Sequence, residues 1–369
     1  MALPTALRAP AAAIAIAIAA AAALSACSAQ APADAPAAAE PGGEAAISDD
    51  RCALNRDAGT VTYLTGYQYQ ASASILEILA AEELGYFDAL CIDLEIQPGT
   101  GDTGQNTQLV ASDQVQFTSV SQQNLLQAQD TGIDIRGISS YSNVGLEVLM
   151  TGTDITDLTQ LDGTILGHKG DLPPAVHAML DNAGVDVGSL QQVVVGYDPS
   201  VLPRGQVQSL TGFISNEPNL LEAAGEEVTV WRPYDLDVPS SLGALTVNPA
   251  FAQDHPTVVE DFLRASFHAF EHCEDNGEEC VGYAADLSGE GYDAAHNLKI
   301  WETEVGIIRD TQTGDLGAID LDNVAAIATM LDDYALLETP LTPAEAQAFF
   351  LPDVVPAIYD GGELVWPAP

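Results

Sequence analysis

Aromatic and polar side chains follow the predicted strands of this sequence at the points where those strands end. Aromatic faces stack on planar ligands, whereas amide, hydroxyl and charged groups fix a ligand's polar edge. No nucleophile stands beside a base in a recognisable frame, so we expect ligand binding and no catalytic residue. The candidate ligand-binding residues are Tyr67, Gln68, Ser121, Asn143, Lys169, Tyr197, Asn216 and Glu217.

Motifs of known chemistry are scarce in the rest of the chain. The sequence has no Gly-x-Ser-x-Gly elbow, no His-Glu-x-x-His pair and no Asp-x-Asp-x-Asp-Gly calcium loop. Gly99, Gly101 and Gly104 form a Gly-x-Gly-x-x-Gly pattern between a strand and a helix. Because Asp102 would repel a pyrophosphate and the pattern follows the second strand, we interpret it as a loop lining a cleft. We expect neither a cofactor nor a metal.

The composition is strongly acidic. The 369 residues include 54 Asp and Glu against 10 Lys and Arg, giving a formal net charge of −44. Such a chain lacks the clustered cations that bind phosphate, so we expect no nucleic-acid partner. The length favours two lobes over a single small domain.

The first residues carry an export signal. Arg8 precedes an apolar run over 11–23, which is too short for the ~20 residues of a permanent membrane span. The run ends in Leu-Ser-Ala-Cys27, which resembles a bacterial lipobox. We predict a lipoprotein signal peptide over 1–26, lipidation of Cys27 and a flexible tether over 27–58. The protein would then be anchored at the outer face of the cytoplasmic membrane.

The other four cysteines fit an oxidising compartment, in which three pairings are possible. Cys273 and Cys280 enclose six residues of a polar turn, which favours a local bridge. That choice leaves Cys52 to pair with Cys91. No cysteine or histidine spacing supports a zinc site instead.

Strand-like and helical patterns alternate from residue 60 onward, which predicts βαβ units, an α/β fold and a mostly parallel sheet. The tail beyond residue 292 is predicted to be helical without a further sheet. We predict one lobe from 59–145 with 245–369, a second lobe from 146–244, and a hinge of two strands between them. Strands are predicted at 60–67, 92–96, 115–120, 135–141, 146–150, 164–167, 192–195, 211–215, 228–231 and 244–247.

The sequence resembles a type II periplasmic binding protein, the solute receptor of an ABC importer. More narrowly, it is similar to the family that binds alkanesulfonates, nitrate and thiamine pyrimidine precursors. The segments that carry this resemblance are 80–87 with 92–96, 109–112 with 115–117, 174–180 with 183–184, and 205–218, which ends in Asn216-Glu217-Pro218.

The resemblance implies two Rossmann-like lobes that close on a ligand in the cleft. In that family's pattern Glu217 would accept hydrogen bonds from ring or amino N–H groups, beside Asn216, and Tyr67, Tyr197 or Trp231 would stack on the ligand. The sequence departs from the pyrimidine-precursor pattern at 68–72. Apart from Arg204 and Arg232 no arginine stands in a predicted loop, so a neutral or cationic heterocycle is favoured over a strong anion.

These observations give a first hypothesis of a monomeric, lipid-anchored receptor that delivers a small planar nutrient to an ABC permease. One alternative is an exported enzyme, either a hydrolase or a pyrimidine-synthase-like protein on the same fold. Another is a receptor for riboflavin, a sulfonate or nitrate. A third is a binding domain that signals to a membrane sensor.

Overall fold

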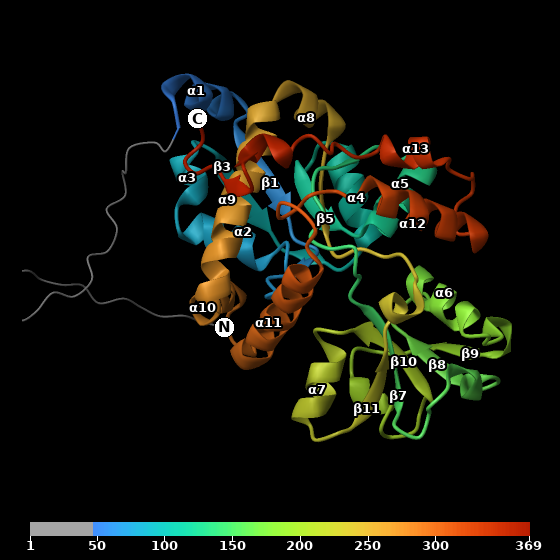
Figure 1. Ribbon diagram of the computed structural model, residues 1–369. Helices are drawn as coiled ribbons and strands as arrows, with labels where there is room; N and C mark the ends of the chain where they lie inside the picture. The colour runs from blue at the N-terminus through green and yellow to red at the C-terminus, as the bar shows by residue number, and fades with distance from the viewer. Residues whose placement is uncertain (1–46) are drawn as a thin grey trace, which may run out of the picture. The chain divides into compact units, whose positions relative to one another are not determined.

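The structure is a computed structural model that describes residues 47–369 (Figure 1). The predicted signal peptide, Cys27 and the larger part of the predicted tether lie outside the described residues. Within the described residues, no helix combines the length and the apolar character that crossing a membrane requires.

The tether prediction is wrong for its last residues, because helix α1 (Asp49–Asp57) forms there. The Ser48 hydroxyl caps the helix by accepting the Arg51 N–H at 3.3 Å. Arg51 also pairs with Glu260 and Asp261 of helix α9 (Pro256–Asp275), each at 2.7 Å. These contacts hold α1 on the folded body.

The first five-stranded sheet has the order β3-β1-β5-β12-β6. Tyr63 of β1 is opposite both Ile96 of β3 and Phe117 of β5, in parallel register. We call the elements around this sheet the first lobe. Its strands are β1 (Thr60–Leu64), β3 (Asp93–Gln97), β5 (Phe117–Val120), β6 (Arg136–Gly137) and β12 (Ala244–Val247).

The second five-stranded sheet has the order β11-β7-β10-β8-β9, and we call the elements around it the second lobe. With the helices α6 (Pro174–Asn182) and α7 (Glu217–Ala223), this sheet forms the green and yellow part of Figure 1. Its strands are β7 (Glu147–Gly152), β8 (Ile165–His168), β9 (Gln191–Val194), β10 (Ser209–Phe213) and β11 (Val228–Trp231).

Both sheets are mixed, so the expectation of a mostly parallel sheet is wrong. In each sheet two of the four strand pairings are parallel and two are antiparallel. The antiparallel strands are those beside the crossings between lobes: β7 starts the second lobe, and β12 carries the chain back into the first. The α/β class and the two-lobed architecture are confirmed.

The two crossings meet at an isolated antiparallel bridge between Ser142 and Leu242. Leu242 donates its N–H to the Ser142 carbonyl oxygen at 2.9 Å. The lobes are therefore joined by two adjacent extended segments, which is the geometry of a hinge.

Helices cover both sheets. In the first lobe α9 runs alongside α2 (Figure 1), and the ring of Phe262 on α9 stacks on Phe117 of β5 with centroids 4.2 Å apart. The remaining helices are α2 (Leu76–Glu83), α3 (Tyr86–Ala89), α4 (Thr103–Ala111), α5 (Gln122–Asp130), α6 (Pro174–Asn182), α7 (Glu217–Ala223), α8 (Pro249–Asp254), α9 (Pro256–Asp275), α10 (Gly277–Ser288), α11 (Ala294–Thr311), α12 (Leu321–Asp333) and α13 (Pro343–Gln347).

Short elements complete the fold. The C-terminal tail adds an antiparallel pair, β13 (Tyr359–Asp360) with β14 (Glu363–Leu364), so the expectation of no further sheet is wrong. A second small ribbon pairs β2 (Tyr67–Gln68) with β4 (Gly99–Thr100). The single-turn 3₁₀ helices are η1 (Leu158–Leu161), η2 (Val187–Ser189), η3 (Pro199–Val201), η4 (Pro233–Leu236) and η5 (Pro356–Ile358).

The disulfide pairing is confirmed. Cys52 pairs with Cys91, joining α1 to the segment before β3, and Cys273 pairs with Cys280 across the α9–α10 turn.

Candidate ligand-binding site

A cavity of about 620 Å³, which we call the cleft pocket, is lined by residues of both lobes. Its volume lies within the usual range for small-molecule sites. From the first lobe come the β2–β4 ribbon, the start of α4 and the start of α11; from the second come the ends of β8 and β10 and the start of α7. The lining residues are Gly66, Tyr67, Gln70, Gly101, Thr103, Glu147, Lys169, Asp171, Pro173, Tyr197, Thr211, Gly212, Phe213, Asn216, Leu220 and His296.

Four of the eight candidate residues predicted from the sequence line this pocket: Tyr67, Lys169, Tyr197 and Asn216. The structure brings them together from different strand ends, as expected for βα loops at the carboxyl edges of sheets.

Glu217 lies behind the pocket wall and does not line it. Its side chain is 1% exposed and contacts the Lys169 ammonium group. It also accepts the Phe213 N–H at 2.7 Å and the Asn216 amide at 3.1 Å. In this conformation its carboxylate is engaged by Lys169, Phe213 and Asn216, and a direct contact between Glu217 and a ligand stays a prediction.

Gly212 makes room for this arrangement. A Cβ at that position would lie 2.8 Å from the Glu217 carboxylate and 2.7 Å from the Met150 methyl group. Pro218 stands in the first turn of α7, where its missing N–H costs no hydrogen bond. The Asn-Glu-Pro segment therefore turns the chain sharply from β10 into α7.

Lys169 is held between aromatic rings as well as by Glu217. Its Nζ lies 5.4 Å from the ring centroid of Tyr197 and 5.3 Å from that of Phe213, within cation–π range. Burial lowers the pKa of Lys169 to about 8, and the adjacent Glu217 carboxylate opposes this by favouring the ammonium form.

Three other predicted ligand-binding residues, Gln68, Ser121 and Asn143, do not line the cleft pocket. Ser121 caps α5 by accepting the Asn124 N–H at 3.1 Å. Asn143 donates to Asp320 at 2.8 Å beside the hinge. Gln68 has a positive φ of 45° and lines an adjoining cavity of about 460 Å³.

Trp231, an expected stacking residue, is also outside the cleft pocket. It lies on the edge strand β11 and donates its indole N–H to the Thr151 hydroxyl at 2.9 Å. Its indole is therefore bonded to the neighbouring strand of the second sheet.

The glycine pattern serves to place Tyr67. Gly99 donates its N–H to the Thr65 hydroxyl at 2.9 Å, and a Cβ on Gly99 would collide with the Thr65 carbonyl oxygen. Gly101 has a φ of +88°, and a Cβ there would lie 3.1 Å from the Tyr67 ring. The interpretation of this loop as part of a cleft lining fits these contacts, which form the β2–β4 ribbon.

An inner chamber of about 230 Å³ shares Tyr67, Phe213 and Asn216 with the cleft pocket. Serine residues and glycines line much of it, together with the Glu304 carboxylate of α11. Burial raises the pKa of Glu304 to about 7.

Helix α11 joins the lobes beside this chamber. Glu304 accepts the Ser215 hydroxyl of the second lobe at 2.7 Å and the Ala73 N–H of the first lobe at 2.8 Å. His296 Nε2 lies 2.7 Å from the Asn216 amide oxygen, and burial lowers the pKa of His296, which favours its neutral form. Three side chains of one helix face thus reach the other lobe, the third being Thr303 with Asn219.

Sequence reasoning missed four important residues of this region: Glu147, Phe213, His296 and Glu304. Glu147 and Phe213 begin β7 and end β10, where strand boundaries were uncertain by a few residues. His296 and Glu304 lie on α11, a helix distant in sequence from the second lobe. Only the packing of α11 against that lobe decides which of its residues face the site.

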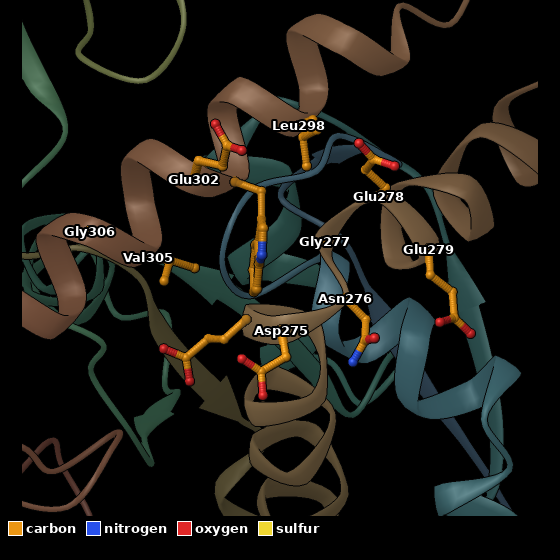
Figure 2. Close-up of a pocket in the computed structure, with 11 residues that line it drawn as sticks. Asp275, Asn276, Gly277, Glu278, Glu279, Leu298, Glu302, Val305 and Gly306 are labelled. Carbon is orange, nitrogen blue, oxygen red and sulfur yellow. The ribbon is translucent and has the colours of Figure 1, made fainter.

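The described residues contain no group of three His, Cys, Asp or Glu side chains that could hold a metal ion. A separate cavity of about 700 Å³ lies at the α9–α10 turn against α11 (Figure 2). Carboxylates including Glu278, Glu279 and Glu302 surround it, and all of its lining comes from residues 274–306. Because one lobe supplies the whole cavity, movement of the lobes would not enclose a ligand there.

The fold and the cleft pocket define a two-lobed binding protein. The chain belongs to the NMT1/THI5-like family, whose model matches residues 72–280, more than half of the sequence. This confirms the resemblance noted from the sequence. No curated protein matches the sequence.

Solved structures share this fold at low sequence identity. The periplasmic aliphatic sulphonate-binding protein SsuA from Escherichia coli is similar with a TM-score of 0.57 and 14% identity, over 84% of this chain and 96% of that one. The ligand-binding component of an ABC-type import system from Staphylococcus aureus, with zinc bound, is similar with a TM-score of 0.59 and 12% identity. The match covers 80% of this chain and 98% of that one. A variant of DszB in complex with biphenyl-2-sulfinic acid is similar with a TM-score of 0.54 and 15% identity. The match covers 80% of this chain and 97% of that one.

Proposed function

We propose that this protein is an extracytoplasmic solute-binding lipoprotein of an ABC importer, capturing a small planar nutrient similar to a thiamine pyrimidine precursor. The observation that carries the proposal is the cleft pocket, which is lined by aromatic and hydrogen-bonding residues of both lobes beside a two-segment hinge. A ligand in such a position contacts both lobes only when they are closed. It therefore shifts the population toward the closed state.

The side chains of the pocket suit a flat ligand with a polar edge. Tyr67, Tyr197 and Phe213 are exposed aromatic rings and can stack on it. Asn216, Gln70 and Thr211 can exchange hydrogen bonds with ring or amino N–H groups.

The remaining parts of the proposal concern location and partners. Lipidation of Cys27 would hold the protein at the outer face of the cytoplasmic membrane, and the oxidised cysteine pairs agree with an extracytoplasmic site. The closed receptor, acting as a monomer, would deliver its ligand to an ABC permease.

An enzyme on the same fold is the second candidate, because DszB shares it and holds a sulfinic acid in the structure compared. The imidazole of His296 lines the cleft pocket and could serve as a base, but its Nε2 already lies against Asn216. Turnover of a bound ligand would favour this candidate.

Other ligands of the wider family are weaker candidates. Riboflavin is planar, but sulfonate and nitrate are anions that arginine holds best. The lining of the cleft pocket contains no arginine among the described residues, and its one lysine is already paired with Glu217.

A thermal-shift panel on the full chain tests the proposal, using a thiamine-precursor aminopyrimidine, riboflavin, an alkanesulfonate and nitrate. A ligand present at 100 times its dissociation constant should add about 2.7 kcal/mol to the free energy of unfolding. Stabilisation by the aminopyrimidine without turnover is the expected result. Stabilisation by none of the four, or chemical conversion of a bound ligand, would contradict the receptor proposal.

A further inference from the structure

The cleft pocket holds more negative than positive charge. Glu147 and Asp171 line it, whereas the charge of Lys169 is balanced by Glu217 behind the wall. His296, the remaining basic residue of the lining, favours its neutral form because burial lowers its pKa. A ligand that enters this pocket therefore meets two carboxyl groups that no cation of the described residues pairs with.

Glu147 is the acidic residue of the lining that most clearly lacks a cationic partner. It is the first residue of β7 and is directly opposite Phe213 in the antiparallel register. Among the described residues it takes part in none of the ion pairs. Burial raises the pKa of its carboxyl group, so a cation placed beside it would stabilise the ionised form. Glu217, the acid behind the pocket wall, differs from Glu147 because it contacts a cation and accepts two N–H donors.

Three aromatic rings stand around the same space. Tyr67, Tyr197 and Phe213 are 42%, 69% and 44% exposed, values that are high for such large apolar groups. Two of these rings already face a cation, since the Lys169 ammonium lies within 5.4 Å of both centroids. The protein's own side chain thus demonstrates that these rings accept a positive charge.

We propose that the ligand of the cleft pocket is a small organic cation, whose charged nitrogen group pairs with Glu147 among the rings of Tyr67, Tyr197 and Phe213. This inference rests on the proposed receptor function and names the charge of its ligand. The net charge of −44 acts in the same direction, because it raises the concentration of cations near the surface.

Isothermal titration of the full chain with three probes of one shape tests this: benzamidine, which is a cation, benzamide, which is neutral, and benzoate, which is an anion. We expect benzamidine to bind at least tenfold more tightly than benzamide, with benzoate weakest, and its affinity to fall with added salt. Glu147→Gln should remove the advantage of benzamidine and leave benzamide unchanged. Glu226→Gln, which removes an exposed charge of the same lobe outside the pocket, should preserve the advantage.

Asp171→Asn is a second variant, because Asp171 is exposed and its substitution is expected to leave folding intact. A smaller loss of benzamidine affinity, about threefold, is expected. Equal affinity for benzamidine and benzamide, or equal effects of Glu147→Gln and Glu226→Gln, would overturn the inference. Tight binding of a neutral aminopyrimidine with no binding of cations would overturn it while leaving the receptor function intact.

Discussion

The hydroxyl of Ser215 in the second lobe donates to the buried carboxylate of Glu304 in the first lobe at 2.7 Å. Both side chains line the inner chamber, next to the cleft pocket. The described conformation therefore contains a direct polar link between the lobes, within reach of the proposed ligand.

Ser215→Ala is predicted to weaken ligand binding about tenfold, because it leaves a buried acceptor of Glu304 without its donor whenever the lobes close. Titration calorimetry with the ligand found by the thermal-shift panel measures this. Ser209→Ala is a matched control, since Ser209 is buried in the same lobe and its hydroxyl has no hydrogen-bond partner. Equal losses for the two variants would show that the Ser215–Glu304 bond does not contribute to closure.

Lys169→Met is predicted to lower the free energy of unfolding by about 3–5 kcal/mol, because it leaves the buried Glu217 charge without its partner. The double variant Lys169→Met with Glu217→Gln should recover a large part of the loss. Urea unfolding followed by circular dichroism provides the measurement.

The exposed pair Arg204–Asp198 supplies the control for that experiment. Both side chains are 59% exposed, and Arg204→Met should change stability little. A loss for Lys169→Met no larger than that for Arg204→Met would argue against a buried pair at Lys169 and Glu217.

Gly99→Ala is predicted to destabilise the β2–β4 ribbon and to weaken ligand binding, because the added methyl group collides with the Thr65 carbonyl and displaces Tyr67. The expected cost is about 1–3 kcal/mol, as for other overpacked positions. Gly104→Ala tests the same motif without a clash, since its Cβ would meet only the Asp102 side chain at 3.5 Å. Gly104 lies in the first turn of α4, so alanine should leave stability unchanged or raise it.

Glu77 should make stability depend on pH. Burial raises its pKa from 4.5 to about 7, so the folded protein holds a proton that the unfolded chain releases between these values. The free energy of unfolding therefore falls as pH rises from 5 to 8. Glu77→Gln removes this dependence, and the stability difference should move in favour of the variant by roughly 3 kcal/mol over that range.

Urea unfolding at pH 5, 6, 7 and 8 checks this expectation. Glu226→Gln, which changes an exposed carboxylate of the second lobe, should keep the wild-type pH profile. Parallel profiles for wild type and Glu77→Gln would mean that the carboxyl group of Glu77 titrates alike in the folded and unfolded states.

Local sequence signals predicted the repeating elements well. The strands predicted at 228–231 and 244–247 match β11 and β12 at their observed bounds. Strand direction was harder, because the parallel or antiparallel choice depends on where the chain crosses between lobes and not on the residues of one strand.

The candidate site was predicted in part, for a physical reason. Tyr67, Lys169 and Tyr197 were identified because a strand end fixes which residues reach the cleft. Ser121 also follows the end of a strand, but its hydroxyl caps α5 instead. A short polar residue serves caps and ligands equally well, and only the tertiary contacts distinguish them.

The attachment of α1 has a mechanical consequence. The Cys52–Cys91 bridge and the Arg51 ion pairs fasten the start of the described chain to one half of the molecule only. Any load that arrives from the preceding residues is transmitted to that half through a covalent bond. The other half receives that load only indirectly, through the two hinge segments and the contacts of α11 with Ser215, Asn216 and Asn219.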